Sequence, residues 1–418
     1  MSIKNQNIYM SVQEEKSNLL TFVIPSRNNA EFLRLAYNSI RALEDCHYII
    51  VLDDLSTDNT SELIVGWNLS DENFSSYLNP TDERMGVVGM FDKGIEMAKT
   101  DFIVAFHADM ICSPNFDKNI LKHLKKGVVV CGTRVEPPLH PAGPEKITMD
   151  LGDGWENFDS IQCRTQLEML ETQNKDKITS GIFAPWACHK DDYISIGGHD
   201  ALFAPQSKED SDLFNRMFLS NYQLIQSWDA LVYHFTCRGS RYNPSSGGNV
   251  GKDSAEWIAT NEKSHRNFIR KWGRPVMHDE YMKPIVPMKY DIGLKIKNIN
   301  LSALSHIEPI FSTIYTETDC SAYIENEQSK TLYNLNEKFK PFSTKFSNDI
   351  IVTIDNDSFF SETTKRISEM LPHLLDTINE PGNYTIPLSG LQGKVEINIQ
   401  FLQGHEYDNV VNKNIFSK

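Results

Sequence analysis

Short apolar runs alternate with stretches of helical periodicity over the first 135 residues. The apolar runs are rich in β-branched residues and are predicted to be strands: LLTFVIP (19–25), YIIVL (48–52), FIVAFH (102–107) and GVVVCG (127–132). The stretches between them space apolar residues for helices, notably over 31–43, 86–99 and 114–124. This order predicts an α/β fold in which crossover helices join parallel strands.

The pattern of hydrophobic and polar residues changes after residue 285. Four segments are predicted to be strands, KYDIGLKIKNI (289–299), SAYIE (321–325), DIIVTIDN (349–356) and KVEINIQF (394–401), and residues 362–378 form an amphipathic helix pattern. We therefore expect an N-terminal tail (1–18), a main α/β domain (19–284) and a small α+β domain (285–418).

Two stretches lack a steady period. Residues 135–178 hold EPPLHPAGPEK and DLGDGWENFD and predict a long excursion over the sheet, while GSRYNPSSGGNVGK (239–252) predicts a Gly- and Ser-rich loop. Long excursions of this kind are often binding loops.

Polar side chains follow two of the predicted strands directly. Asp53 and Asp54 come after the second strand, and Asp109 follows FIVAFH. The carboxyl ends of parallel strands line the ligand crevice of such sheets. For either cluster alone, a helix-capping role for the aspartates is the more common case.

Charge and apolar runs restrict the partners. The net charge of -15 and pI of about 5.3 repel phosphate backbones, so no nucleic acid partner is expected. No apolar run approaches the roughly 20 residues of a membrane span, and the N-terminus lacks a secretory signal. Seven scattered cysteines without a C-x-x-C pair fit a reducing compartment, so a cytoplasmic location is expected. Association with further copies of the chain stays open.

Candidate chemistry starts from Asp109. A divalent cation on hard ligands neutralises a diphosphate, and Asp109 is the candidate anchor for Mn²⁺ or Mg²⁺. His234, after the strand-like LVY, is a candidate second ligand, although a packed histidine is the more common case. Glu209 and Asp210 precede apolar residues at helical spacing, so they either supply a base or merely cap a helix.

Three arginines are candidate partners of a diphosphate, because guanidinium groups bind phosphate oxygens bidentately. They are Arg84, Arg238 and Arg241. Surface arginine on a polar loop is an equally frequent interpretation.

Five segments occur in an order that resembles the family 2 glycosyltransferases with the GT-A fold. They are FVIPSRN, VLDDLSTDNT, RMGVVGMFDKGIEMAKTDFIVAFHADM, ISIGGHDALF and KEDSDLFNRM, within roughly residues 19 to 240. The resemblance implies a Rossmann-like, mostly parallel sheet flanked by helices. It also implies inverting transfer from a nucleotide diphosphate sugar, with a UDP-sugar favoured, to a hydroxyl of a glycan or other acceptor.

The resemblance assigns roles to individual positions. Asp53 or Asp54 would contact the base beside Pro25, Ser26 and Arg27; Asp109 would bind the metal; Asp210 would be the general base; Trp186 and Gly198 would line the acceptor and sugar side. Glu209 would cap or orient the helix. The first acidic position of Asp-x-Asp, which often touches the ribose in the family, is replaced in His107-Ala108-Asp109. The Gln-x-x-Arg-Trp signature of processive members is absent, so a non-processive hexosyltransferase is expected.

Two other functions are weighed. A sugar nucleotidyltransferase would share the sheet and the metal, but the Gly-rich, basic loop that grips a triphosphate is missing after residues 19–25. A non-catalytic nucleotide-sugar-binding module would explain His107 as decay of the site. Retention of Asp109, Glu209 and Asp210 argues against it.

Overall fold

The computed structural model describes residues 19–354, 361–378, 380–387, 394–402 and 404. These residues form two compact units, one of 19–260 with 277–285 and one of 261–276 with the described part of 286–404. The division differs from the expected boundary at 284/285. The C-terminal part of α9 (Ala255–Trp272) packs with the second unit, whereas 277–285 packs with the first.

The first unit is built on a mixed, mostly parallel sheet of ten strands within the described residues. Its main path runs β3 (Phe74–Leu78), β2 (Tyr48–Asp53), β1 (Leu20–Ser26), β4 (Phe102–Ala105), β9 (Trp186–His189), β6 (Val128–Glu136), β10 (Gln223–His234) and β5 (Met110–Cys112). β9 and β5 are antiparallel to their neighbours. The short β7 (Ile147–Thr148) pairs with β6, and β8 (Ile178–Thr179) with β10. The expected α/β class is confirmed.

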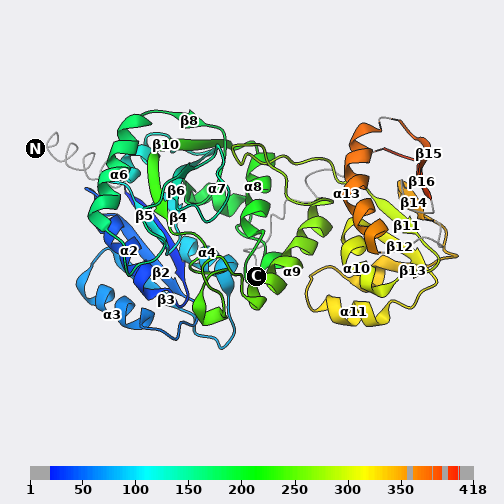
Figure 1. Cartoon of the computed structure of the whole chain (residues 1–418), viewed down its shortest axis with the longest axis horizontal. Helices are drawn as coiled ribbons and strands as arrows, with labels where there is room; N and C mark the ends of the chain where they lie inside the picture. Colours follow the sequence, from blue (N-terminus) through cyan, green and yellow to red (C-terminus); the bar gives the residue numbers. More distant parts are fainter. Residues whose placement is uncertain (1–18, 355–360, 379, 388–393, 403, 405–418) are drawn as a thin grey trace, which may run out of the picture. The chain divides into compact units, whose positions relative to one another are not determined.

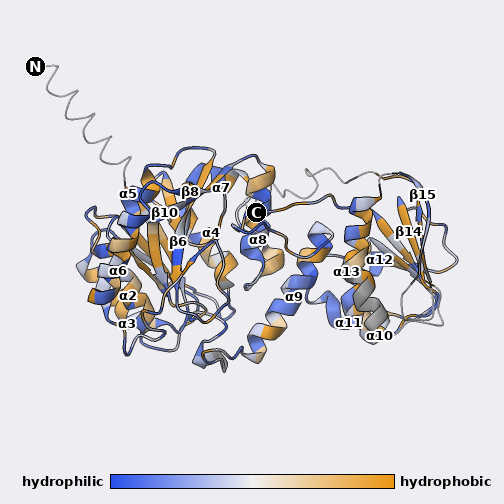
Figure 2. Cartoon of the chain, turned by 45° about the horizontal axis from the view of Figure 1, so that its top comes forward, coloured by the Kyte–Doolittle hydropathy of each residue, from blue (hydrophilic) through white to orange (hydrophobic). Residues whose placement is uncertain are grey.

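Helices cover this sheet (Figure 1). They are α2 (Ala30–Arg41), α3 (Thr60–Ser70), α4 (Gly86–Met97), α5 (Phe116–Leu121), α6 (Ser160–Gln173), α7 (Lys190–Ser195), α8 (Glu209–Leu219) and the start of α9, with 3-10 turns η1 (Ala201–Phe203) and η2 (Pro244–Ser246). α2 buries Leu33, Ala36 and Ile40, spaced for one helical face. Figure 2 shows the hydrophobic residues gathered in the strands, as a sheet covered on its faces requires.

Helix α6 was not expected, because residues 135–178 show no steady period. It buries Cys163, Leu167 and Leu170 at helical spacing, but Ile161 and Met169 are 78% and 50% exposed and blur the pattern. The Asp159 carboxylate accepts from the backbone N–H groups of Ile161 and Gln162 and so caps the helix.

The second unit has its own six-stranded sheet among the described residues. The order is β13 (Phe339–Pro341), β12 (Thr313–Thr316), β11 (Ile292–Lys295), β14 (Ile350–Ile354), β16 (Lys394–Ile399) and β15 (Gly382–Pro387). The first four are parallel, and β16 and β15 are antiparallel. The helices are α10 (Leu301–Ile307), α11 (Ser321–Gln328), α12 (Leu335–Lys338) and α13 (Ser361–Thr377), with the 3-10 turn η3 (Glu308–Ile310).

One expected strand of this unit is wrong. SAYIE forms the first part of helix α11, since the Asp319 carboxylate accepts from the backbone N–H of Ser321 at 3.0 Å and so starts a helix there. The apolar run of Ala322 to Ile324 is too short to distinguish a strand from a helix by period.

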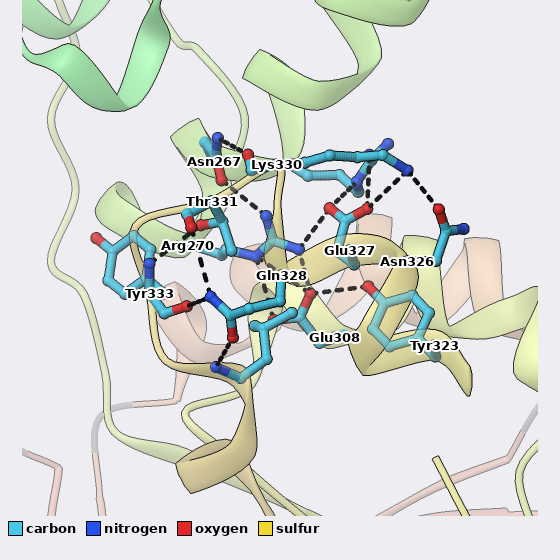
Figure 3. Close-up of polar contacts among 12 residues, drawn as sticks. Asn267, Arg270, Glu308, Tyr323, Asn326, Glu327, Gln328, Lys330, Thr331 and Tyr333 are labelled. Carbon is cyan, nitrogen blue, oxygen red and sulfur yellow. Dashed lines mark hydrogen bonds and ion pairs between the residues drawn. The ribbon is translucent and has the colours of Figure 1, made fainter. Parts of the chain in front are cut away.

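A buried ion cluster ties the end of α9 into the second unit (Figure 3). The Arg270 guanidinium lies 2.5 Å from the Glu308 carboxylate and 2.8 Å from that of Glu327. Tyr323 donates to Glu308 at 2.9 Å. Since a buried charge without its partner is strongly destabilising, these pairs couple α9 to η3 and α11. Among the described residues, no helix combines the length and apolar character that a membrane crossing needs.

Candidate active site

A cavity of about 470 Å³ opens at the carboxyl ends of β1, β2, β4, β6 and β10. Many of the residues expected in the site line it: Pro25, Ser26, Arg27, Asp54, Arg84, His107, Ala108, Asp109, Glu209, His234 and Arg241. The expectation that polar residues after parallel strands gather at one edge agrees with this geometry. Five expected residues are not among its lining: Asp53, Trp186, Gly198, Asp210 and Arg238.

Asp54 is engaged by the protein itself. Its carboxylate accepts from the backbone N–H groups of Met85 and Gly86, both at 2.9 Å, and from the Asn79 amide at 2.9 Å. Gly86 has a φ of +68°, and a Cβ there would lie 2.1 Å from the carbonyl oxygen of Pro205. Asp54 therefore fixes the loop that brings Arg84 to the cavity.

Asp53 points elsewhere. Its carboxylate accepts from the backbone N–H of Ser56 at 3.2 Å, and burial raises the pKa of this carboxyl. It holds the turn after β2 and does not cap a helix, because α3 begins only at Thr60.

Three polar side chains at the end of β1 and just after it line the cavity with buried atoms that have no hydrogen-bond partner among the described residues: Ser26 Oγ, Arg27 Nε and Asn29 Nδ2. Burial and the neighbouring charge of Arg84 lower the pKa of Arg27. An unpaired buried polar group costs about 1–3 kcal/mol, so this edge suits a polar ligand. Asn29 was not among the expected site residues.

His107, Asp109 and His234 offer ligand atoms that lie within 4.8 Å of one another. His234 Nε2 lies 3.5 Å from the Asp109 carboxylate. Burial acts to raise the pKa of Asp109, but His234 outweighs it and holds the value at about 2. The backbone N–H of Arg238 donates to the second oxygen of Asp109 at 2.9 Å. One carboxylate and two imidazoles are a suitable donor set for a divalent cation.

Glu136, at the end of β6, was missed. Its carboxylate lies 2.8 Å from His234 Nδ1, 3.1 Å from Arg134 and 2.9 Å from Lys146. Because Nδ1–H of His234 donates to Glu136, Nε2 faces Asp109. The long excursion after β6 carries Lys146 into the cavity, as a binding loop should.

Glu209 and Asp210 open α8 after two residues with left-handed backbone, Ser207 (φ 78°) and Lys208 (φ 69°). Glu209 lines the cavity, and its Oε2 is buried without a hydrogen-bond partner among the described residues. Burial, followed by the charge of Asp210, raises the pKa of Glu209 to about 8. Asp210 instead lies 4.0 Å from His199 Nε2.

The structure does not bring Trp186 and Gly198 to the cavity. Trp186 is 1% exposed on β9 and stacks on Tyr193 in the core, with ring centroids 5.9 Å apart. Gly198 (φ 64°) makes the turn after α7. Trp186 lies in the core because a large aromatic ring on a central strand gains most from burial there.

The expected arginines are already paired with acidic groups. Arg84 lies 2.6 Å from Glu256, and Arg241 binds Asp253 at 2.8 and 3.0 Å. The side chain of Arg238 donates to the carbonyl of Asp153. Arg84 and Arg241 line the cavity, whereas Arg238 acts through its backbone on Asp109.

The expected loop 239–252 closes against the turn after β1. The Asn243 amide donates to the carbonyls of Arg27 and Asn28, at 3.3 and 3.2 Å, and the Asn28 amide donates to Ser245 at 3.1 Å. Through these contacts the loop adds Gly239, Ser240 and Arg241 to the cavity.

Residues 21–184 match the sequence profile of Glycosyl transferase family 2. No curated protein matches the chain. Solved structures that are similar include GalNAc-T7 with UDP, GalNAc and Mn²⁺ (12% identity, TM-score 0.39, 52% of this chain and 43% of that one). They also include the mannosyltransferase PcManGT from Pyrobaculum calidifontis with GDP-Man and Mn²⁺ (15% identity, TM-score 0.39, 60% of this chain and 63% of that one). A third is S. aureus TarS 1–349 with UDP-GlcNAc (14% identity, TM-score 0.38, 60% of this chain and 72% of that one).

The chain thus spans less than two thirds of the first two of these structures, 43% and 63% of their lengths. The profile match covers β1 to β4 and continues to residue 184, just before β9, so it includes the turn with Asp53 and Asp54 and the segment His107 to Asp109. Residues 21–184 of the first unit are therefore similar to family 2 glycosyl transferases, as the order of the motifs had indicated.

Proposed function

We propose that the first unit is a metal-dependent, inverting glycosyltransferase that moves a sugar from a nucleotide diphosphate donor, with a UDP-sugar favoured. The observation that carries this proposal is one cavity that holds the metal-ligand group of His107, Asp109 and His234 together with the carboxylate of Glu209, whose Oε2 is buried. A sugar transferase needs both features, one for the leaving diphosphate and one for the acceptor hydroxyl.

The cation would be held by Asp109 and His234, with His107 as a third ligand. Two imidazoles favour Mn²⁺ over Mg²⁺, because Mg²⁺ demands oxygen ligands in near-octahedral geometry. When bound, the cation supplies positive charge against the departing diphosphate. On this proposal His107 binds the metal, although it stands at the position whose acidic residue often contacts the ribose in the family.

The nucleoside would bind at the edge formed by Ser26, Arg27 and Asn29, whose buried polar atoms lack partners among the described residues. Arg84 and Arg241 line the same cavity and would face the diphosphate by exchanging contacts with Glu256 and Asp253. Asp54 would act indirectly, by holding the loop that carries Arg84.

The base that takes the acceptor proton would be Glu209, in a single displacement that inverts the anomeric carbon. Its place in the cavity lining supports this assignment over Asp210, which faces His199. The acceptor would be a hydroxyl of a glycan or similar molecule, and transfer would be non-processive. The free thiols of all seven cysteines support a reducing, cytoplasmic setting.

The test is metal-dependent donor binding. Thermal unfolding with Mn²⁺ and a panel of nucleotide sugars should show stabilisation by one donor, about 2.7 kcal/mol at 100 times its dissociation constant. Asp109→Asn should abolish that stabilisation, whereas the exposed Asp101→Asn should keep it. Unchanged Mn²⁺-dependent binding in Asp109→Asn would refute the metal assignment. Release of pyrophosphate from a nucleoside triphosphate and a sugar phosphate would indicate a nucleotidyltransferase instead.

A further inference from the structure

His199 is a histidine that the proposed mechanism does not use, yet it lies beside the carboxylate pair of α8. The side chain is fully buried, and its ring stacks on Phe91 with centroids 5.5 Å apart and an interplanar angle of 18°. The backbone N–H of His199 donates to the Asp92 carboxylate at 3.0 Å. The residue is therefore fixed to α4 through both its backbone and its ring.

Both ring nitrogens face acidic or polar groups. Nδ1 lies 2.6 Å from the hydroxyl of Tyr193 and 3.3 Å from the Asp92 carboxylate. Nε2 lies 4.0 Å from the Asp210 carboxylate and has no hydrogen-bond partner among the described residues. The imidazole thus bridges the Asp92 side of α4 and the Asp210 side of α8.

The surroundings favour the charged form of the ring. Burial alone lowers the pKa of a histidine, but Asp210 and Asp92 outweigh it and raise the pKa of His199 to about 9. The other groups that act on this cluster are Glu209, whose pKa the His199 charge lowers, and Lys208, which also acts on Glu209. His107 interacts with Asp210, and Arg216 acts on Tyr193. A buried imidazolium with a carboxylate on each side is the arrangement expected of a fixed counter-charge.

We propose that His199 is a positioning residue, an inference that rests on the proposed function: its cationic ring pairs with Asp210 and leaves Glu209 as the carboxylate that takes the acceptor proton. Two adjacent carboxylates acquire different roles when their environments differ. Here Asp210 has a buried counter-charge, whereas Glu209 reaches the cavity with a buried oxygen that has no partner within the described chain.

The test combines two measurements, the pH dependence of sugar transfer and a titration of the His199 ring. His199→Gln removes the cation, and Asp92→Asn weakens it while retaining an acceptor for the backbone N–H and for Tyr193. Both changes raise the proton affinity of Glu209, so the acid limb of kcat/KM should move to higher pH, by about one unit in His199→Gln and less in Asp92→Asn. The exposed His306→Gln is the matched control and should leave the limb in place.

NMR titration of the imidazoles provides a reading that needs no turnover, with the His199 signal assigned by its loss in His199→Gln. The ring should stay charged above pH 8 in the parent protein and titrate at lower pH in Asp92→Asn. If His199→Gln does not fold, the acid limb of Asp92→Asn still decides. Normal transfer with an unmoved acid limb in the folded variants, or a His199 ring that is neutral at pH 7, would overturn the role of His199 alone. A parent protein that turns over no nucleotide sugar would overturn the proposed function and this role with it.

Discussion

Glu209 and Asp210 are neighbours in the chain but meet different surroundings. The first turn of α8 directs Glu209 to the cavity and Asp210 toward His199. The family resemblance pointed to Asp210 as the base, whereas the geometry favours Glu209. At the scale of single residues, the assignment depends on which carboxylate can reach an acceptor hydroxyl within about 2.6 to 3.2 Å.

Exchange of each carboxylate for its amide separates the two roles. Glu209→Gln is expected to lower turnover by about 10²–10⁴ with little change in donor affinity, because a base is lost and not a donor contact. Asp210→Asn is expected to retain transfer and to shift the acid limb to lower pH, since the charge of Asp210 raises the pKa of Glu209. Loss of turnover at every pH in Asp210→Asn, with near-normal turnover in Glu209→Gln, would return the base to Asp210.

Glu136 is expected to control metal affinity without touching the metal. Glu136→Gln removes the charge that orients His234, and such changes typically cost about 10–100-fold in affinity. Calorimetric titration with Mn²⁺ measures this loss, and thermal unfolding without metal checks the fold. Glu168→Gln, at an exposed position on α6, should bind Mn²⁺ like the parent. Equal affinity in both variants would exclude a role of Glu136 in orienting His234 for the metal.

At the scale of elements, the start of α4 connects the fold to the site. Asp54 binds its first backbone N–H groups, and Gly86 allows the close approach of the segment around Pro205 that precedes α8. A loop after β2 and the segment before α8 therefore meet at one backbone position. The loop 239–252 makes a comparable closure over the turn after β1.

Gly86→Ala should disturb both stability and donor binding. The added Cβ would meet the Pro205 carbonyl at 2.1 Å, and the positive φ of 68° adds strain. We expect a loss of about 1–3 kcal/mol in the free energy of unfolding, with weaker donor binding because Arg84 shifts. Gly66→Ala is the control: it lies in α3 with no atom within 4 Å of the added Cβ, so it should be neutral or stabilising. Equal stability of the two variants would mean that the backbone at 86 relaxes freely.

At the scale of the whole molecule, no single cut separates the two units. Residues 261–276 pack with the second unit, but 277–285 return to the first. The returning segment brings Met282 to the cavity and the carbonyl of Tyr281 against Gly181.

A chain shortened to end at residue 285 should therefore be less stable than the full chain and prone to aggregate. It would leave Ile269 without the hydrophobic core of the second unit and Arg270 without Glu308 and Glu327. A chain ending at 260 avoids this exposure but loses Met282 from the site. Thermal unfolding and donor binding of both shortened chains, beside the full chain, test the division. Full stability and donor binding in the chain ending at 285 would contradict it.

The sequence by itself determined the α/β order of the first unit and the position of its polar residues. Strand and helix patterns and the residues that follow each strand are local features, so Asp54, His107 and Asp109 could be placed at one sheet edge in advance. His234 could also be named, because it ends a recognisable strand. Helix α6 and the helix over SAYIE could not be predicted, because exposed apolar residues or a short run hid the period.

Only the tertiary structure decided which side chains share the cavity and in what state. Glu136 lies 98 positions from its partner His234, and His199 lies 107 positions from Asp92, so no local pattern relates them. The direction of Glu209 and Asp210 depends on how α8 packs through Leu213, Phe214 and Met217. Burial and long-range charge then separate the two carboxylates, and neither quantity exists until the chain has folded.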